Sequence, residues 1–251
     1  MTVLRVEAMS GQALGFLISY GIKPCAIDNA GMDACDRLVS ADVCGVCSRM
    51  MEQRFGVPAL FCVSAAADQV PGQQALLDEI SPSGSVVHRD VGVAQGLVYV
   101  AQYGGMMGRD AIGIAEKIEC TNADATIRHS ALSFRWPTHS VRQAEGPKPA
   151  PEIIASGETD ITAEIFTLGD AAFVAEKPEI NCETERALQA LSPFRHTLLM
   201  CMVNGGMKYM PDRLAYERNT FEAQRSMLMP GAAEQFVQLT AEALRRIAQK
   251  G

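Results

Sequence analysis

A carboxylate just beyond a short apolar segment is the first candidate for chemistry in this sequence. Asp68 follows the apolar run Ala59–Val63 and a loop of small residues at 64–67. A short apolar run of this kind is typical of a buried strand, and ligand clefts of α/β proteins open where such strands end. We therefore expect Asp68 to face a cleft, where a carboxylate can take part in catalysis.

Two cysteines have the spacing of a redox pair or of half a metal site. Cys44 and Cys47 both fall within residues 41–55, which are predicted to be helical. A structural zinc site needs four ligands, and the sequence offers no second pair. Burial on the helix is therefore favoured over a redox pair. The eight cysteines as a group lie largely in apolar stretches, with no export signal, which favours buried thiols over disulfides.

Acidic residues and histidines are the other groups that could do chemistry. Asp28, Asp33, Asp36 and Asp42 could bind a hard cation, but their spacing misses the calcium-loop template, so a solvated loop is favoured. The four histidines have no neighbouring cysteine, serine or aspartate in a triad arrangement. Neither group predicts a site.

Composition limits the classes of function. The chain has 251 residues, 48% of them hydrophobic, so it can bury one good-sized core, and we expect a single domain over 1–251. A net charge of −7 with scattered basic residues disfavours nucleic acid as a partner. No apolar run reaches the roughly 18 residues that span a bilayer, and no basic N-terminal stretch leads into an apolar segment. We expect a cytoplasmic protein with a small-molecule ligand or a protein partner, and no membrane contact.

The hydrophobic pattern alternates strands with helices, which predicts a layered α/β fold with a mixed sheet and flanking helices. Expected strands are the hairpins 2–8 with 13–20 and 162–168 with 171–175, and the segments 59–63, 125–136 and 196–203. Expected helices are 41–55 between Ser40 and Gly56, 90–103 and 109–120 separated by Gly104-Gly105, 181–191, and 230–249. The segment 143–157, which carries Pro and Gly, is expected to be a connection.

Short motifs follow one another along nearly the whole chain. They are Leu17-Ile18-Ser19-Tyr20, Leu38-Val39-Ser40-Ala41-Asp42, Ala65-Ala66-Ala67-Asp68-Gln69-Val70-Pro71, Ser192-Pro193-Phe194-Arg195-His196-Thr197, Asn204-Gly205, Lys208-Tyr209-Met210-Pro211, Ala215-Tyr216 and Pro230-Gly231-Ala232. In order and spacing they resemble the later part of the catalytic domain of neutral, non-lysosomal ceramidases, with its "Y-x-x-H-P-T", "L-I-S-A-D", "A-A-G-D-V-S-P", "S-P-F-K-H-T", "N-G", "G-Y-x-P-T", "A-Y" and "P-G-A". The resemblance implies a single ceramidase-like α/β domain that lacks the family's N-terminal segment.

The resemblance also implies a zinc site, from which the sequence departs. Members of that family bind zinc through two histidines, a glutamate and a tyrosine, and the zinc activates water to attack an amide. The first histidine belongs to the missing segment. Lys23 stands at the second, Glu179 at the glutamate and Phe221 at the tyrosine. A protonated lysine and a phenyl ring supply no ligand, so we expect no metal and no other cofactor.

These departures lead to a hypothesis for the site. Lys23 places its cation where zinc would bind and pairs with Glu179, because a buried carboxylate is costly unless paired. The pair is either a structural remnant or a remodelled pocket in which Lys23 acts as electrophile or base. The candidate catalytic residues are Lys23, Asp68 and Glu179, and the candidate substrate-binding residues are Gln69, Asn204, Tyr209 and Phe221.

Two classes of function remain open. In the first, the chain is a hydrolase of the ceramidase-like group that acts on an amide-bearing or related small molecule with a zinc-free pocket. In the second, it is a non-catalytic subunit or a small-molecule-binding module. The missing segment would supply strands, so its absence predicts an apolar edge that a separately encoded chain or a second copy covers.

Overall fold

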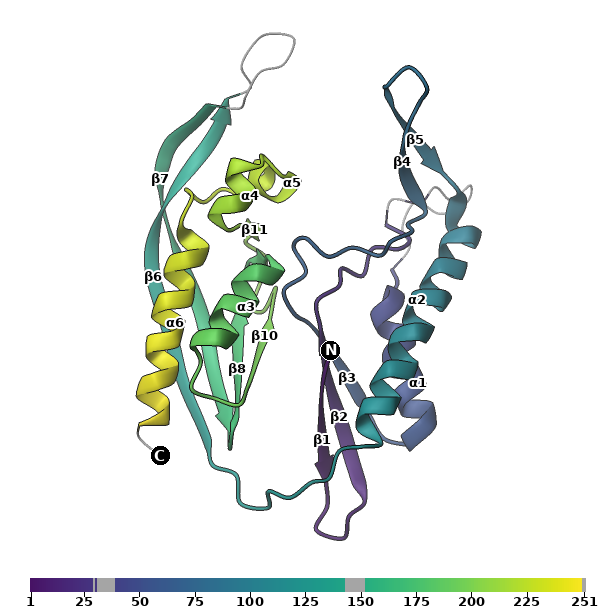
Figure 1. Cartoon of the computed structure of the whole chain (residues 1–251), viewed down its shortest axis with the longest axis vertical. Helices are drawn as coiled ribbons and strands as arrows, with labels where there is room; N and C mark the ends of the chain where they lie inside the picture. The colour runs from purple at the N-terminus through teal and green to yellow at the C-terminus, as the bar shows by residue number, and fades with distance from the viewer. Residues whose placement is uncertain (29, 31–38, 143–151, 250–251) are drawn as a thin grey trace. The chain divides into compact units, whose positions relative to one another are not determined.

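Two compact units make up the part of the chain that the computed structural model describes, residues 1–28, 30, 39–142 and 152–249. Unit 1 comprises Met1–Cys62 and Val70–Ala123, and unit 2 comprises Val63–Gln69 and Asp124–Gly251. The single domain that the sequence suggests therefore stays a prediction. Each unit contains strands and helices (Figure 1), and the four-stranded sheet of unit 2 has both parallel and antiparallel pairs, which confirms the predicted α/β class.

Unit 1 is built on a three-stranded sheet. β1 (Thr2–Glu7) and β2 (Ala13–Tyr20) form the predicted antiparallel hairpin, and β3 (Ala59–Val63) is the other neighbour of β2. Phe16 and Ile18 of β2 are buried, so the strand contributes the apolar side of the hairpin to the core. The strands predicted at 2–8, 13–20 and 59–63 are thus confirmed.

A long helix, α1 (Asp42–Phe55), follows close to its predicted bounds. It ends at Gly56, whose φ of 69° is a conformation that glycine adopts without strain. The hydroxyl of Ser40 accepts the Asp42 N–H at 2.9 Å, although the helix begins one residue later than expected. Cys44 and Cys47 are buried on it, as predicted, and burial raises the pKa of Cys44 to about 12 and that of Cys47 to about 11.

The second helix of unit 1, α2 (Gly92–Ala115), is continuous, whereas the sequence predicts two helices separated by Gly104-Gly105. Two of its glycines lie against α1. A Cβ on Gly104 would be 2.5 Å from the Cβ of Val46, and one on Gly108 would be 2.6 Å from the Sδ of Met50. The glycines allow a close approach of two helices and do not break α2, so the prediction of a break was wrong.

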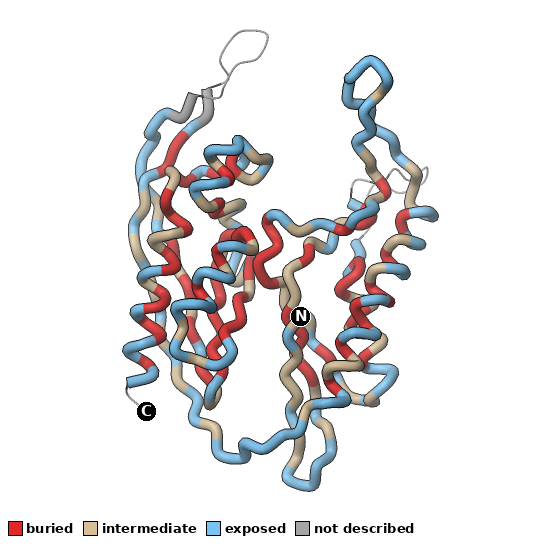
Figure 2. The backbone as a smooth tube through the Cα atoms, viewed as in Figure 1, coloured by how far each residue is buried: buried red, intermediate tan, exposed pale blue. Residues whose placement is uncertain are grey.

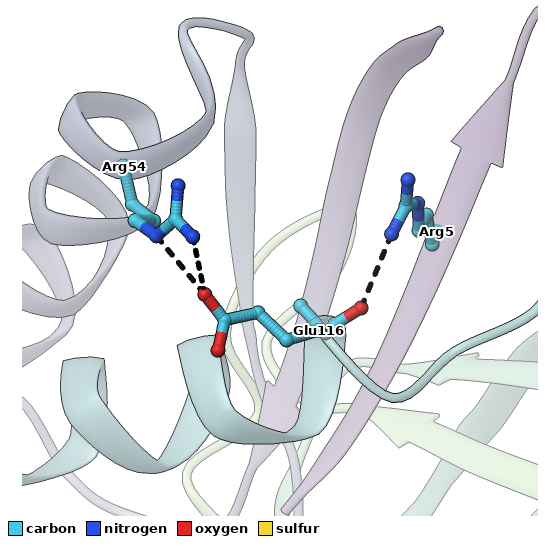
Figure 3. A network of polar contacts seen from close by, with 4 residues as sticks. Arg5, Arg54 and Glu116 are labelled. Atoms are coloured by element: carbon cyan, nitrogen blue, oxygen red, sulfur yellow. Dashed lines mark hydrogen bonds and ion pairs between the residues drawn. The ribbon is translucent and has the colours of Figure 1, made fainter. Parts of the chain in front are cut away.

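Polar contacts attach the end of α2 to its neighbours (Figure 3). Arg54 at the end of α1 donates from Nε and Nη2 to Oε1 of Glu116, at 3.0 and 2.6 Å, and Arg5 of β1 donates to the Ala115 carbonyl at 3.3 Å. The carbonyls at a helix end lack partners within the helix, and Arg5 supplies one. The Arg54–Glu116 pair is half exposed, so it contributes little stability.

A hairpin of β4 (Leu76–Ile80) and β5 (Val86–Asp90) is present that the sequence did not predict. Its strands are largely exposed, so they lack the regular alternation that marks a half-buried strand. Its base is fixed by backbone hydrogen bonds from Ala75 N–H to the Ala26 carbonyl at 2.7 Å and from Val91 N–H to the Ala75 carbonyl at 2.9 Å.

Unit 2 contains a four-stranded mixed sheet in the order β10-β8-β7-β6. β8 (Ala171–Glu176) pairs in parallel with β10 (His196–Met200) and antiparallel with β7 (Glu152–Leu168), which pairs with β6 (Ile127–Arg142). The hairpin predicted on either side of residues 169–170 is confirmed. All six residues of β8 are buried, as expected for a strand inside a sheet.

The segment predicted as a connection, 143–157, is wrong in its last part. Residues 152–157 belong to β7, while 143–151 lie outside the described residues. The partner strand β6 continues past the predicted 125–136 through Pro137, which is tolerated there because β6 is the edge strand of the sheet, where a missing N–H costs little. Gly157 is opposite Thr138, next to a register shift between Thr138 and His139.

Two amphipathic helices cover one face of this sheet, α3 (Cys182–Leu191) and α6 (Ala232–Ala248) (Figure 1). Figure 2 shows the buried residues running along β8 and the inner side of α6. The core includes Leu188 of α3, Phe236 of α6 and Leu199 of β10, each with an exposed fraction of 0%. Within the described ranges, no helix has both the length and the apolar character to cross a membrane.

Candidate functional site

Two short strands bring the first pair of candidate residues together in unit 2. β9 (Glu179–Ile180) and β11 (Tyr209–Met210) are parallel, with Glu179 opposite Tyr209 and Ile180 opposite Met210. Ile180 and Met210 are fully buried. Because side chains alternate along a strand, Glu179 and Tyr209 point to the opposite, partly exposed face. The Glu179 N–H also donates to the Lys208 carbonyl at 2.7 Å, which fixes the start of the pairing.

Phe221 joins this pair through its ring. It is the first residue of α5 (Phe221–Arg225), after Thr220, whose side chain accepts the Ala223 N–H and caps the helix. The Phe221 and Tyr209 rings are 5.9 Å apart, edge to face at 71°, and the Arg225 guanidinium lies 5.4 Å from the Phe221 ring centroid. The ring is held on two sides and is still 55% exposed. Glu179, Tyr209 and Phe221 therefore form one cluster.

Asp68 binds the start of α3. Its Oδ1 accepts the Cys182 N–H at 3.0 Å and its Oδ2 accepts the Cys182 thiol at 3.2 Å. A carboxylate at a helix N-terminus satisfies an unpaired N–H and interacts favourably with the helix dipole. Burial and the Asp68 carboxylate raise the pKa of the Cys182 thiol to about 11. The structure thus gives Asp68 a structural task, and its catalytic role stays a prediction.

The loop that carries Asp68 is attached to β9. The Ala67 N–H donates to the Ile180 carbonyl at 3.0 Å, and the Gln69 N–H closes a turn on the Ala66 carbonyl at 3.1 Å. These two hydrogen bonds place Asp68 and Gln69 next to β9, the strand that begins with Glu179. The signal in the sequence, a small-residue loop after an apolar run, located this position without showing its helix-capping contact.

Asn204 lies in a loop with several left-handed residues. Met202, Asn204 and Lys208 have φ values of 62°, 59° and 57°, between the end of β10 and the start of β11. Asn204 is exposed. Left-handed residues other than glycine are uncommon, and strained segments cluster at ligand-binding sites. The loop with these strained residues immediately precedes Tyr209, the first residue of β11.

Glu176, which the sequence analysis missed, is a buried carboxyl at the end of β8. It is 1% exposed, and its Oε1 accepts the Cys201 thiol at 3.0 Å. Among the described residues, its Oε2 has no hydrogen-bond partner. Burial raises the pKa of Glu176 well above its ordinary value, with a smaller contribution from the Glu185 carboxylate. An apolar run that ends in a glutamate, residues 171–176, was the signal that could have revealed it.

Lys23 belongs to unit 1, so its pairing with Glu179 stays a prediction. It lies just before a segment that α1 holds in place. The Asp42 carboxylate accepts the N–H groups of Ala26 at 3.2 Å and of Ile27 at 3.1 Å. Lys23 is therefore carried by a backbone anchored three residues further along. Of the other aspartates in the acidic run, Asp33 and Asp36 lie outside the described residues.

The residues do not fit the zinc site that the resemblance implies. Glu179 has a metal-binding group, but Phe221 presents a hydrocarbon ring and Lys23 an ammonium. In the part of the chain that is described, no three His, Cys, Asp or Glu side chains are grouped so that they could hold a metal ion. A zinc-dependent mechanism does not follow from this set of side chains.

Comparison with known proteins shows the fold. No family model matches the chain, and no curated protein matches it significantly. The chain is similar to the crystal structure of neutral ceramidase from Pseudomonas aeruginosa, with a TM-score of 0.68 and 16% identity over 97% of this chain and 46% of that one. It is also similar to a ceramidase complexed with C2, with a TM-score of 0.69 and 17% identity over 97% and 47%. The predicted ceramidase-like fold is confirmed, and the chain spans about half the length of these structures.

Proposed function

We propose that this chain, on the fold it shares with part of the neutral ceramidases, binds an amide-bearing small molecule without zinc. The observation that supports the proposal is the cluster of Glu179, Tyr209 and Phe221, in which Glu179 is the cross-strand neighbour of Tyr209 and the Tyr209 ring contacts that of Phe221. A carboxylate accepts a hydrogen bond from an amide N–H, and an exposed ring covers the apolar chain attached to the amide. Gln69 and Asn204 are assigned to the polar end of the ligand, because they lie on the two loops that reach β9 and β11.

The first test is binding of N-hexanoylethanolamine, a small amide with a short apolar chain. We expect Phe221→Ala to weaken its binding about five- to tenfold, because an aromatic contact contributes about 1 kcal/mol. Titration calorimetry on the whole chain gives the Kd. The matched control is Phe166→Ala, since Phe166 is also an exposed aromatic residue of unit 2 but contacts His129.

A second variant separates the carboxylate from the rings. Glu179→Gln should weaken binding of the amide and leave binding of ethyl hexanoate, which has no N–H, unchanged. If Phe221→Ala and Phe166→Ala have the same effect, or if Glu179→Gln weakens both ligands equally, the assignment of the amide to this cluster is wrong.

Hydrolysis of the bound amide is the role that the sequence gives to Lys23. On this proposal the Lys23 ammonium stabilises the negative charge that develops on the amide oxygen, while Glu179 takes a proton from the attacking water and returns it to the ethanolamine nitrogen as the C–N bond breaks. We expect Lys23→Met to slow release of hexanoate from N-hexanoylethanolamine by about 100-fold, measured by chromatography. Lys117→Met is the control, because Lys117 is an exposed lysine of the same unit.

The outcomes distinguish the two classes of function. An unchanged rate in Lys23→Met contradicts a catalytic Lys23. A measurable Kd without any release of hexanoate by the purified chain supports the alternative, a non-catalytic subunit or binding module.

A further inference from the structure

Ser226 is a buried residue that connects two members of the Glu179, Tyr209 and Phe221 cluster. It is the C-cap of α5, the short helix that begins with Phe221, and it is 5% exposed. Its Oγ donates to the Tyr209 carbonyl at 2.8 Å. The Tyr209 ring contacts the Phe221 ring at the other end of the same helix. Both ends of α5 therefore contact one residue, Tyr209.

The Ser226 hydroxyl has further partners that fix its orientation. The Leu228 N–H donates to Ser226 Oγ at 3.1 Å. The Tyr216 hydroxyl lies within hydrogen-bond distance of both Ser226 Oγ, at 3.1 Å, and the Leu228 carbonyl. A backbone N–H can only donate and a carbonyl can only accept, so the proton of Ser226 is directed to the Tyr209 carbonyl.

The segment that follows Ser226 is anchored to β6 by backbone hydrogen bonds. The His139 N–H donates to the Met227 carbonyl at 2.8 Å, and the Met229 N–H donates to the Pro137 carbonyl at 2.9 Å. The hydroxyl of Ser226 is therefore carried by a chain segment that a long strand of the sheet holds in place.

We propose that Ser226 is a positioning residue of the amide-binding site, an inference that rests on the function proposed above. Its hydroxyl fixes the backbone of Tyr209 relative to α5 and so keeps the Tyr209 ring in contact with the Phe221 ring. Without the hydroxyl, the Tyr209 carbonyl loses this donor, and β11 is no longer tied to the end of α5. Because Ser226 is buried, it acts through the two rings and not on the ligand itself.

The first readout needs no ligand. In a whole chain with ¹³C-labelled tyrosine, the ring signals of Tyr209 are identified by their loss in Tyr209→Phe, and Phe221→Ala gives the shift caused by removing the neighbouring ring. We expect Ser226→Ala to move the Tyr209 signals in the same direction as Phe221→Ala does. Ser226→Thr keeps the hydroxyl, and we expect it to leave these signals at their wild-type positions.

Ser192→Ala is the matched control. Ser192 Oγ accepts the Phe194 N–H at 3.2 Å and the Thr197 hydroxyl at 2.6 Å, so its removal also costs hydrogen bonds of unit 2, but these contacts do not include Tyr209. We expect Ser192→Ala to leave the Tyr209 signals unchanged. Trp136 fluorescence shows whether each variant keeps unit 2 folded.

The second readout is the Kd of N-hexanoylethanolamine. Ser226→Ala should weaken binding about five- to tenfold, as Phe221→Ala does, because both variants remove the same aromatic contact. The double variant should bind within about twofold of Phe221→Ala, because the second change has no further contact to remove. Independent effects would instead multiply.

The outcomes separate this inference from the proposed function. Ser226 is not a positioning residue if the wild-type chain binds N-hexanoylethanolamine but Ser226→Ala leaves the Tyr209 signals in place, if Ser192→Ala moves them equally, or if the two effects on Kd multiply. A wild-type chain that does not bind N-hexanoylethanolamine overturns the proposed function, and with it the role of Ser226 in amide binding, even where the Tyr209 signals move as expected.

Discussion

Asp42→Ala is expected to destabilise unit 1 by about 3–5 kcal/mol, through the loss of hydrogen bonds to two buried amides. Asp42 is 3% exposed and accepts the N–H groups of Ala26 and Ile27, which are themselves buried. Without the carboxylate, both amides stay in the interior with no acceptor from this position. Alanine also fits poorly at the Asp42 φ of 50°, which aspartate tolerates better. Hydrogen exchange at the amides of Ala26 and Ile27 measures the effect, with an expected acceleration of at least about 100-fold.

Matched variants show whether these hydrogen bonds are responsible. Asp28→Ala removes an exposed carboxylate of the same acidic run and should change stability by no more than about 0.5 kcal/mol. Asp42→Asn keeps one acceptor oxygen and tolerates the positive φ, so its loss of stability should lie between those of Asp42→Ala and Asp28→Ala. Equal exchange rates of these amides in Asp42→Ala and Asp28→Ala would show that the hydrogen bonds from Ala26 and Ile27 to Asp42 do not stabilise this segment.

The hydrogen bonds to Asp42, called the anchor below, also hold the backbone next to Lys23, a candidate catalytic residue. Lys23 precedes Ala26 by three residues, so a frayed anchor releases the backbone that positions its ammonium. If Lys23 acts on a ligand, Asp42→Ala should reduce that action although Asp42 does not contact it. On the role proposed for Lys23, Asp42 would be a positioning residue in addition to stabilising unit 1.

Asp42 illustrates what the sequence could not show. Its partners lie 15 and 16 residues earlier, so neither its burial nor its acceptor role follows from local pattern, and a solvated acidic loop was the natural interpretation. Gly104 is a similar case, because a glycine that makes room for another helix cannot be distinguished locally from one that ends a helix. By contrast, the hairpins of β1 with β2 and β7 with β8 depend on alternation and adjacent turns, and both were predicted.

The candidate site also has residues that the sequence located and contacts that it did not show. Order and spacing of motifs placed Glu179, Tyr209 and Phe221 among the candidates, and the structure brings these three together. The capping of α3 by Asp68 joins residues 114 positions apart, which no motif in the sequence encodes. Glu176 was missed for another reason. A single carboxyl at the end of an apolar strand looks like the first exposed residue after it, and only the packing of β8 shows that it is buried.

Burial of Glu176 makes the stability of unit 2 depend on pH. The side chain is 1% exposed, and burial, followed by the Glu185 carboxylate, raises its pKa well above its ordinary value of 4.5, while the Cys201 thiol bond acts in the opposite direction. Above about pH 4.5 the unfolded chain has released this proton and the folded chain still holds it. Raising the pH therefore favours the unfolded state until the folded pKa is reached. Above that pH the penalty is constant.

We expect Glu176→Gln to remove this dependence and to stabilise the chain at neutral pH. Between pH 5 and the folded pKa of Glu176, the wild-type folding equilibrium should weaken by about tenfold per pH unit relative to the variant, because the two states differ by one proton. Trp136 is the sole tryptophan and belongs to unit 2, so its fluorescence during urea unfolding reports this unit. Glu217→Gln is the control, because Glu217 is exposed and should leave the pH dependence unchanged.

The comparison with the variant also separates Glu176 from His139. Burial lowers the pKa of His139, so its contribution to stability is lost as the pH falls below the ordinary value of 6.5, opposite in direction to that of Glu176. That contribution is the same in the wild type and in Glu176→Gln and cancels in their difference. A difference that is constant from pH 5 to pH 7 would mean that Glu176 is already ionised in the folded chain at pH 5, which would contradict the prediction.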